Sequence, residues 1–139
     1  MGSFAFQGFS NLGKVQLPNT VLEISQYAFQ GCVLLSEINF PDSLESIGEW
    51  AFSDCLELES IILPEHIQNI ELGAFDYCAK LKNVTILSAM CEIKDDETAY
   101  TFNNGEHNGR YFDGIIHGYV DSTAQKYAEK YGRNFILIE

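Results

Sequence analysis

Apolar residues recur with a fixed period along the first two thirds of the chain. The period is 23 positions, and it is most visible in four Ala-Phe dipeptides: Ala5-Phe6, Ala28-Phe29, Ala51-Phe52 and Ala74-Phe75. Other apolar columns keep the same register without a gap, as in Leu12, Leu35, Leu58 and Leu81. Chance does not align so many columns, so the sequence predicts internal structural repeats.

Spacing within the repeat predicts its elements. The Ala, Phe, Cys and Leu columns lie three or four positions apart, which favours one short helical turn. Period-two alternation follows and indicates a short strand, which a proline ends in three repeats. A second extended segment, as in residues 21–24, precedes the next repeat. The expected strands lie near Lys14–Leu17, Glu37–Phe40, Ser60–Leu63 and Asn83–Ile86.

Units this small cannot bury their apolar faces alone. Stacked at roughly 4.8 Å, the spacing of strands in a sheet, they form one continuous core. The sequence therefore predicts an α/β repeat solenoid with its strands side by side in one parallel sheet. We expect a single domain over residues 1–139, with repeats at 5–27, 28–50, 51–73 and 74–93.

Both ends of the array depart from the pattern. Residues 94–114 are polar and acidic and predict a long loop or hairpin that replaces the helical turn of a fifth coil. Residues 115–139 predict a cap: a fifth strand at 115–117, a helix that starts after Asp121 or Ser122 and ends at Gly132, and a closing strand at 135–138. At the other end, upstream sequence or a second molecule is expected to cover the aromatic first coil: Phe4, Phe6, Phe9 and Leu12.

The repeat columns resemble the BspA-like leucine-rich repeat family, whose repeat reads approximately L-x-x-I-x-I-P-x-S-V-x-x-I-G-x-x-A-F-x-x-C. Residues 35–41, Ser43-Leu44, Ile47-Gly48, Ala51-Phe52 and Cys55 match it nearly column by column. The resemblance covers about residues 4–93, and the tail from Ile116 to Ala128 is similar to the ending of these proteins. It implies a right-handed leucine-rich-repeat solenoid with short helical turns and a β-α-β-like cap. It also implies a protein-binding or adhesive module of a bacterial surface or secreted protein.

Charge narrows the choice of partner. The net charge is −12, and the stretch between Val15 and Ala79 holds eleven acidic residues without a single Lys or Arg. Such a surface repels phosphate backbones and anionic lipid, which excludes nucleic acid and membrane surfaces as expected partners. No apolar run approaches the ~20 residues that span a bilayer, and no signal peptide is visible at Met1–Phe4. A protein and a glycan remain as the partner classes.

The positions of the cysteines predict buried core residues, not catalytic or metal-binding ones. Cys32, Cys55 and Cys78 share a column with Phe9, so the position favours a buried apolar group. Adjacent coils could also bring two of these thiols together, so a disulfide is the alternative. Cys91 lies outside this column and is the best candidate for a reactive thiol.

Catalytic and metal-binding motifs are absent from the sequence. His66, His107 and His117 are scattered and lack zinc-ligand spacing. The acidic loop could offer oxygen ligands to calcium, but its acids do not follow an EF-hand pattern and predict a solvated loop: Asp95, Asp96, Glu97, Glu106 and Asp113. We therefore expect no enzyme activity, no cofactor and no specific metal site.

The best candidates for recognition are the outward residues of the main strands, because stacked repeats present them as a regular grid. These residues are Lys14, Gln16, Glu37, Asn39, Ser60, Ile62, Asn83 and Thr85. Ile62 stands out because it is apolar in an otherwise polar column. Each of the polar positions could also be only a solvated strand residue. The alternative function is a spacer or terminal cap of a larger repeat protein, without a ligand of its own.

Overall fold

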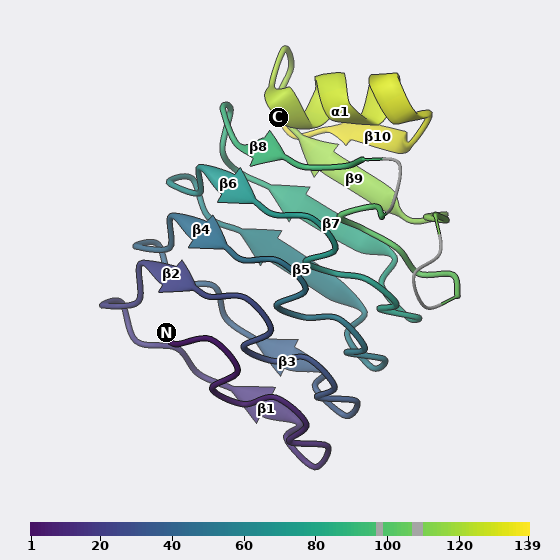
Figure 1. Cartoon of the computed structure of the whole chain (residues 1–139). Coiled ribbons are helices and arrows are strands. Elements are labelled where there is room, and N and C mark those ends of the chain that lie inside the picture. Colours follow the sequence, from purple (N-terminus) through teal and green to yellow (C-terminus); the bar gives the residue numbers. More distant parts are fainter. Residues whose placement is uncertain (97–98, 107–109) are drawn as a thin grey trace.

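The computed structural model is a solenoid of stacked coils with a strand on each of two faces, and it describes residues 1–96, 99–106 and 110–139 (Figure 1). One face carries the main strands: β1 (Lys14–Val15), β3 (Glu37–Ile38), β5 (Ser60–Leu63), β7 (Asn83–Ile86), β9 (Ile115–Gly118) and β10 (Asn134–Leu137). The other carries β2 (Glu23–Ile24), β4 (Ser46–Ile47), β6 (Asn69–Ile70) and β8 (Glu92–Ile93). One helix, α1 (Thr123–Tyr131), closes the C-terminal end.

Strand register follows the sequence period. Every strand pair formed by the described residues is parallel, and within the four repeats residues pair with their equivalents 23 positions further on, as Ser60 with Asn83 and Ile24 with Ile47. The prediction of a parallel solenoid is confirmed. The expected strands are full length at β5 and β7 but only two residues long at β1 and β3.

The core is organised around a column of phenylalanine rings. Successive rings stack with centroids 5.1–5.6 Å apart, in the order Phe6, Phe29, Phe52, Phe75 and Phe102. All but the first are fully buried. Offset stacking of buried aromatic rings stabilises a core beyond the effect of their area, and here the constant rise per coil brings each ring onto the next.

The turn side of each coil differs from the expected helical turn. Alternate N–H groups stay within the coil, as Ala28 N–H donating to the Ser25 carbonyl at 3.3 Å. The groups between them reach the next coil, as Phe29 N–H donating to the Ala51 carbonyl at 2.8 Å. Tyr27, at φ 58°, interrupts the right-handed path. The segment is therefore a run of tight turns joined between coils, and the helical-turn prediction is wrong.

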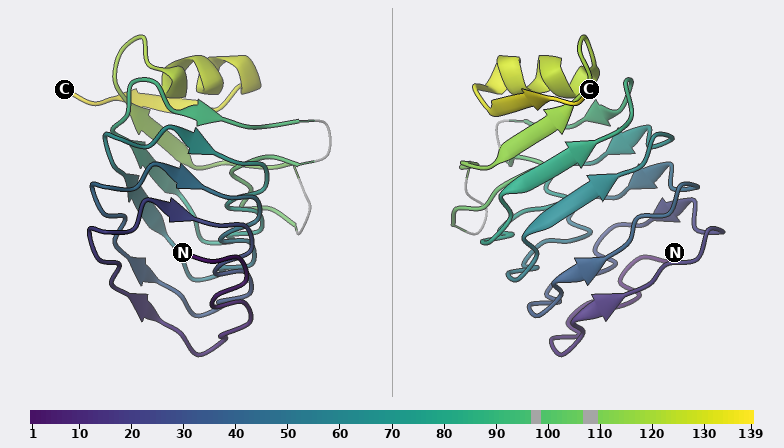
Figure 2. Two further views of the ribbon diagram at one scale, coloured as in Figure 1. Left: turned by 60° about the vertical axis from the view of Figure 1, so that its left-hand side comes forward. Right: turned by 180° about the vertical axis from the view of Figure 1, so that it is seen from behind.

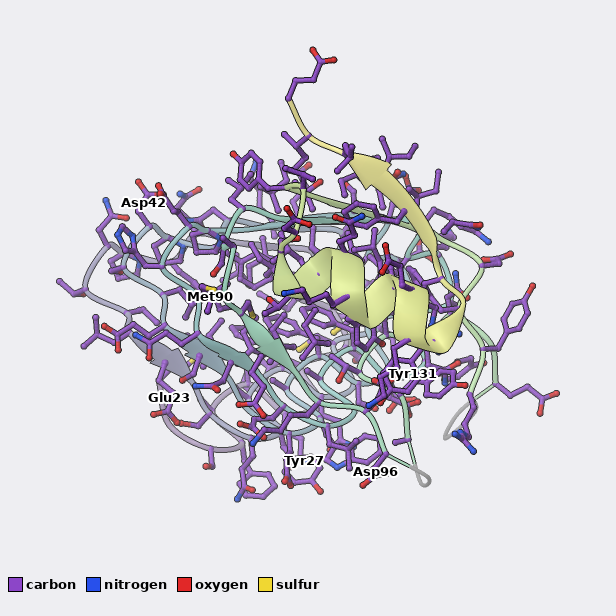
Figure 3. All side chains as sticks on the ribbon, turned by 90° about the horizontal axis from the view of Figure 1, so that it is seen from above. Glu23, Tyr27, Asp42, Met90, Asp96 and Tyr131 are labelled. Atoms are coloured by element: carbon purple, nitrogen blue, oxygen red, sulfur yellow. The ribbon has the colours of Figure 1, made fainter. Side chains whose placement is uncertain are left out.

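The C-terminal cap has the predicted strand–helix–strand form. The Ser122 hydroxyl accepts the Gln125 N–H at the start of α1, and Gly132 ends the helix at φ 64°. Strand β10 pairs parallel with β9. In Figure 3 the helix lies across the end of the stack, with Tyr131 near its C-terminal end. A helix in this position covers the apolar face that the last coil would otherwise expose.

Part of segment 94–114 continues the core instead of forming a loop outside it. Phe102 is fully buried on Phe75, whose N–H donates to the Thr101 carbonyl at 2.9 Å. Asn103 N–H returns a bond to the Phe75 carbonyl at 3.2 Å. The fifth coil therefore keeps its phenylalanine. Its ring comes 27 positions after Phe75, which takes it out of the repeat register.

The acidic residues of this segment do not share one environment. The Asp95 side chain is completely buried, where it accepts hydrogen bonds from Tyr127 Oη at 3.0 Å and Thr101 N–H at 2.6 Å. Arg133 Nη2 lies 4.0 Å from the same carboxylate. Asp113, in contrast, is exposed. The expectation of a solvated acidic loop is therefore wrong for Asp95, and Glu97 lies outside the described residues.

At the other end, the first coil is open as expected. Phe4, Phe6 and Phe9 are exposed. Met1 occupies the position equivalent to Ile24: its amino group donates to the Glu23 carbonyl at 2.7 Å, and its own carbonyl accepts the Ser25 N–H at 3.2 Å. These first residues extend the β2 side of the coil and leave the aromatic side uncovered.

Candidate functional site

The main sheet is broken between its second and third strands. Within the described residues, β1 pairs only with β3, and a separate four-stranded sheet runs β5, β7, β9 and β10. The opposite face is continuous from β2 to β8. Figures 1 and 2 show β3 set apart from β5, whereas β5 and β7 lie side by side. The expectation of one continuous main sheet is therefore wrong at this point.

Phe40 gives a physical reason for the break. The equivalent positions hold smaller aliphatic side chains, namely Leu17, Leu63 and Ile86. The Phe40 ring packs edge-on against Phe52 at 5.5 Å and against Phe75 at 6.5 Å, both in later coils. A larger side chain in a close-packed core forces the backbone to shift. We attribute the separation of β3 from β5 to this ring.

Asn39 ends the short pairing of β1 with β3. Its Oδ1 accepts the Leu17 N–H at 2.6 Å, and its Nδ2 donates to the Leu17 carbonyl at 3.0 Å. The carboxamide thus occupies both backbone groups of Leu17 in the way that a neighbouring strand would. Asn39 is half-buried and holds coil 1 to coil 2. Asn39, one of the recognition candidates, therefore has a structural role in joining the first two coils.

The hydrogen bonds on the other side of β5 show which of its backbone groups face the break. The carbonyls of Glu59 and Leu63 accept N–H groups from Asn83 and Leu87 in the next coil. In a parallel ladder, alternate residues of a strand turn both backbone groups to the same neighbour. Ser60 and Ile62 therefore direct their N–H and C=O groups towards β3. No ladder hydrogen bond reaches these two residues from the described part of β3.

The break opens into a groove of about 530 Å³. Six of the eight candidate residues line it: Lys14, Gln16, Glu37, Asn39, Ser60 and Ile62. Ile62 is 62% exposed, so its apolar side chain is presented to solvent. The two remaining candidates lie on β7, where Asn83 Oδ1 is 3.1 Å from His117 Nε2 and Thr85 pairs with His117 in the strand register.

Charge in the groove is balanced. Lys14 Nζ lies 2.8 Å from Glu37 Oε2, and both side chains are largely exposed. This hydrogen bond raises the pKa of the Lys14 ammonium. An exposed pair of this kind adds little to stability. Lys14 is the one basic residue lining the groove, and Glu37 compensates it.

Comparison with known proteins agrees with the repeat pattern and the coil geometry. A family model of the BspA type leucine rich repeat region matches residues 1–106 in six copies. The chain belongs to this family. Comparison with curated protein sequences gives no significant match.

Two solved structures share the fold of this chain. A leucine-rich repeat protein of T. pallidum is 30% identical, with a TM-score of 0.66 over 83% of this chain and 50% of that protein. The pneumococcal vaccine antigen PcpA shares the fold at 18% identity, with a TM-score of 0.58 over 99% of this chain and 38% of the antigen. The chain therefore spans half or less of the length of these two proteins.

The thiols of this BspA-type chain are buried and free. Each S–H of the cysteine column donates to a phenylalanine carbonyl of the preceding coil, at 3.2–3.4 Å: Cys32 to Phe6, Cys55 to Phe29 and Cys78 to Phe52. The predicted burial of this column is confirmed. Burial raises the pKa of each of these thiols.

Cys91 differs from its prediction as a reactive thiol. Its side chain is fully buried under α1, where the Thr123 hydroxyl donates to the Cys91 carbonyl at 2.5 Å. Burial raises the pKa of the Cys91 thiol to about 12, with a smaller contribution from the Glu92 charge. A thiol with this pKa stays protonated at neutral pH and is a poor nucleophile.

The histidines and acidic side chains of the BspA-type coils do not converge. His66 lies on an exposed turn and His117 on β9, while His107 falls outside the described residues. Across residues 1–96, 99–106 and 110–139, no group of three or more His, Cys, Asp or Glu is arranged to hold a metal ion. In the same residues no helix has the length and hydropathy needed to cross a bilayer.

Proposed function

We propose that the chain is a non-catalytic protein-recognition module that binds its partner through the groove between β3 and β5. The observation that carries this proposal is the exposed Ile62 side chain in a groove lined by polar strand residues. A large apolar residue framed by polar ones is the usual composition of an interface centre. The groove also coincides with six residues that the repeat pattern selects as outward-facing.

The family supports a role in protein interaction. Leucine-rich repeats present regular side-chain grids over extended surfaces, and here the break adds a hollow to an otherwise even face. The resemblance to BspA-like proteins extends the proposal to adhesion and to an extracellular or cell-surface location. A neutral glycan is the second kind of ligand that polar groove residues such as Gln16 and Ser60 could accommodate.

A spacer or terminal cap is the alternative function. The helical cap supports it, because α1 covers the core of the last coil while Phe4, Phe6 and Phe9 of the first coil are exposed. In that case the groove is only a packing consequence of Phe40, and the strand face has no partner.

Surface plasmon resonance against a panel of extracellular-matrix proteins separates the two functions. Ile62→Glu places a charge at the centre of the groove and should weaken binding by about tenfold or more, as at a desolvated interface residue. Val120→Glu is the matched control, because Val120 is 65% exposed on the turn before α1, away from the groove. Equal responses from wild type and both variants would favour the spacer. A glycan array with the same proteins tests the second ligand class.

A further inference from the structure

We propose that the partner binds as an extended polypeptide strand that pairs with the free edge of β5. This inference rests on the proposed function, since it names the partner chemistry of the same groove. In this mode backbone hydrogen bonds provide the affinity, and alternate side chains provide the specificity.

The first support is the set of unpaired backbone groups. Ser60 and Ile62 each turn an N–H and a C=O towards the break, and Ile38 turns the corresponding groups towards it from β3. These donors and acceptors recur at every second residue along the strand. An extended polypeptide presents its own groups at the same interval, whereas a glycan or a folded convex surface does not.

The second support is that this edge is already in place. Strand β5 pairs with β7 over all four of its residues. Its alternate side chains, Ile61 and Leu63, are buried in the core. Ser60 and Ile62 are exposed on the same strand. A rigid, solvent-accessible edge loses little conformational freedom when a strand binds to it, which reduces the cost of association.

The surroundings of the groove indicate the composition of the strand. Half-buried Ile38 and Phe40 would face one set of its alternating side chains, which favours apolar and β-branched residues there. Glu37 is already paired with Lys14, but Glu59 is exposed just before β5, and the stretch between Val15 and Ala79 holds eleven acidic residues and no Lys or Arg. Basic residues are therefore favoured at the alternate positions.

The outer edge of β10 is the competing site for strand addition. It ends the second main sheet, and Ile136 and Leu137 are about half exposed on it. The groove favours β5, because there a bound strand would contact two coils instead of one. Strand binding at β10 would contradict the proposal.

Two substitutions at one position test the backbone contribution. Ile62→Pro removes the N–H that faces the break, while the ladder from β5 to β7 uses the N–H groups of Ile61 and Leu63. Ile62→Thr removes most of the apolar side chain but keeps the N–H. Circular dichroism and thermal unfolding establish that both variants are folded.

The probe is a blocked octapeptide of alternating Lys and Val, and its control is the same sequence with every amide N-methylated. We expect the octapeptide to bind wild type and to shift the amide resonances of Ser60 and Ile62. The octapeptide should bind Ile62→Pro about tenfold more weakly than Ile62→Thr, because the proline variant loses the backbone hydrogen bond to the peptide and the contacts next to it. The methylated peptide should bind wild type at least about tenfold more weakly than the octapeptide does.

Three results would overturn strand addition: equal binding by the two Ile62 variants, equal binding of the two peptides to wild type, or shifts centred on β10. The peptide comparison uses wild type alone, so it stands even if Ile62→Pro unfolds. Loss of matrix-protein binding in Ile62→Glu together with one of these results would leave the proposed function intact and reject only its strand-addition mode. Unchanged matrix-protein binding in Ile62→Glu rejects the proposed function itself.

Discussion

Cys91 shows how the helical cap changes the environment of a single repeat position. The equivalent residues of the earlier coils are all exposed, namely Leu22, Glu45 and Gln68. Cys91 is buried because α1 lies over this edge of the last coil. The period of the sequence assigns Cys91 to an outward position, and only the packing of the cap reverses that assignment.

All four thiols should be inert in the native protein. Burial raises the pKa of each of them, that of Cys91 to about 12, so the reactive thiolate is scarce near pH 8. A colorimetric disulfide reagent should detect no thiol before denaturation and four after it. A rapidly reacting thiol in the native protein would contradict the burial of Cys91. Fewer than four thiols in unreduced, denatured protein would mean that a disulfide forms.

Asp95 should make stability depend on pH. Burial raises the pKa of its carboxyl group, and this effect outweighs the opposing hydrogen bonds from Thr101 and Tyr127 and the Arg133 charge. Between the ordinary pKa of 3.8 and the raised native value, the folded state keeps a proton that the unfolded state loses. The contribution of Asp95 to the free energy of unfolding is therefore fully present below pH 3.8 and is lost as pH rises through the native pKa.

Asp95→Asn isolates this contribution. Urea unfolding of wild type and variant from pH 3.5 to pH 7 gives the difference between their free energies of unfolding. We expect wild type to lose stability relative to the variant as pH rises. The charge of Arg133 is constant over this range, so its effect is a constant offset. A difference that does not vary with pH would show that the Asp95 pKa is unshifted.

At the scale of elements, period-two alternation predicted the strands more reliably than three-and-four spacing predicted the turn side. Alternation with one buried face indicates a β-strand and nothing else. Strands β5 and β7 lie where this alternation predicted them. Three-and-four spacing fits both a helical turn and a run of tight turns. The positive φ angles of Tyr27 and Trp50 show that the segment forms tight turns and not a helical turn. The sequence does not indicate this, because Tyr and Trp are not residue types that favour a left-handed conformation.

Phe40→Leu should close the main sheet. Leucine is the residue of the equivalent positions in the first and third coils, and it removes the ring that reaches Phe52 and Phe75. We expect β3 to pair with β5 and to protect the Ile62 amide. In native-state hydrogen exchange, this amide should exchange rapidly in wild type and at least about tenfold more slowly in the variant. Slow exchange of the Ile62 amide in wild type would show that the break is closed in solution.

Phe102→Ala should destabilise the domain by about 3–5 kcal/mol, the usual cost of truncating a buried phenylalanine. The ring is fully buried between Phe75, Phe112 and the cap residue Tyr127. Phe9→Ala is the control, because Phe9 is 57% exposed at the open end. Chemical denaturation should show a small loss for the control. A comparably small loss for Phe102→Ala would mean that the fifth coil adds little to the core.

At the scale of the molecule, the residues of the groove were predictable and the groove was not. The period identified the outward strand positions, since burial alternates along the main strands of the four repeats, β1, β3, β5 and β7. The break leaves that period unchanged, because coil 2 and coil 3 have equal lengths. A phenylalanine in a column of aliphatic residues was the one available signal, and its effect depends on how the ring packs against later coils.

The open first coil should limit the stability of this chain. Covering about 300 Å² of apolar surface is worth several kcal/mol before the cost of association. A consensus coil fused before Ser3 should therefore raise the melting temperature by several degrees and reduce self-association, as measured by calorimetry and analytical ultracentrifugation. Equal melting temperatures, with both proteins monomeric at high concentration, would show that Met1 to Phe4 already cover this end.

The column of stacked phenylalanines also bears on how such a gene can change in length. Each ring meets the next in the same orientation, at a centroid separation of 5.1–5.3 Å through the regular repeats. Duplication of residues 51–73 would add one ring to the column and shift every later ring by the same step. Unequal recombination in units of one repeat can therefore lengthen the array without mismatching the core. An insertion that is not a whole number of repeats changes the spacing between rings along the sequence, as in the fifth coil, where Phe102 follows Phe75 by 27 positions instead of 23.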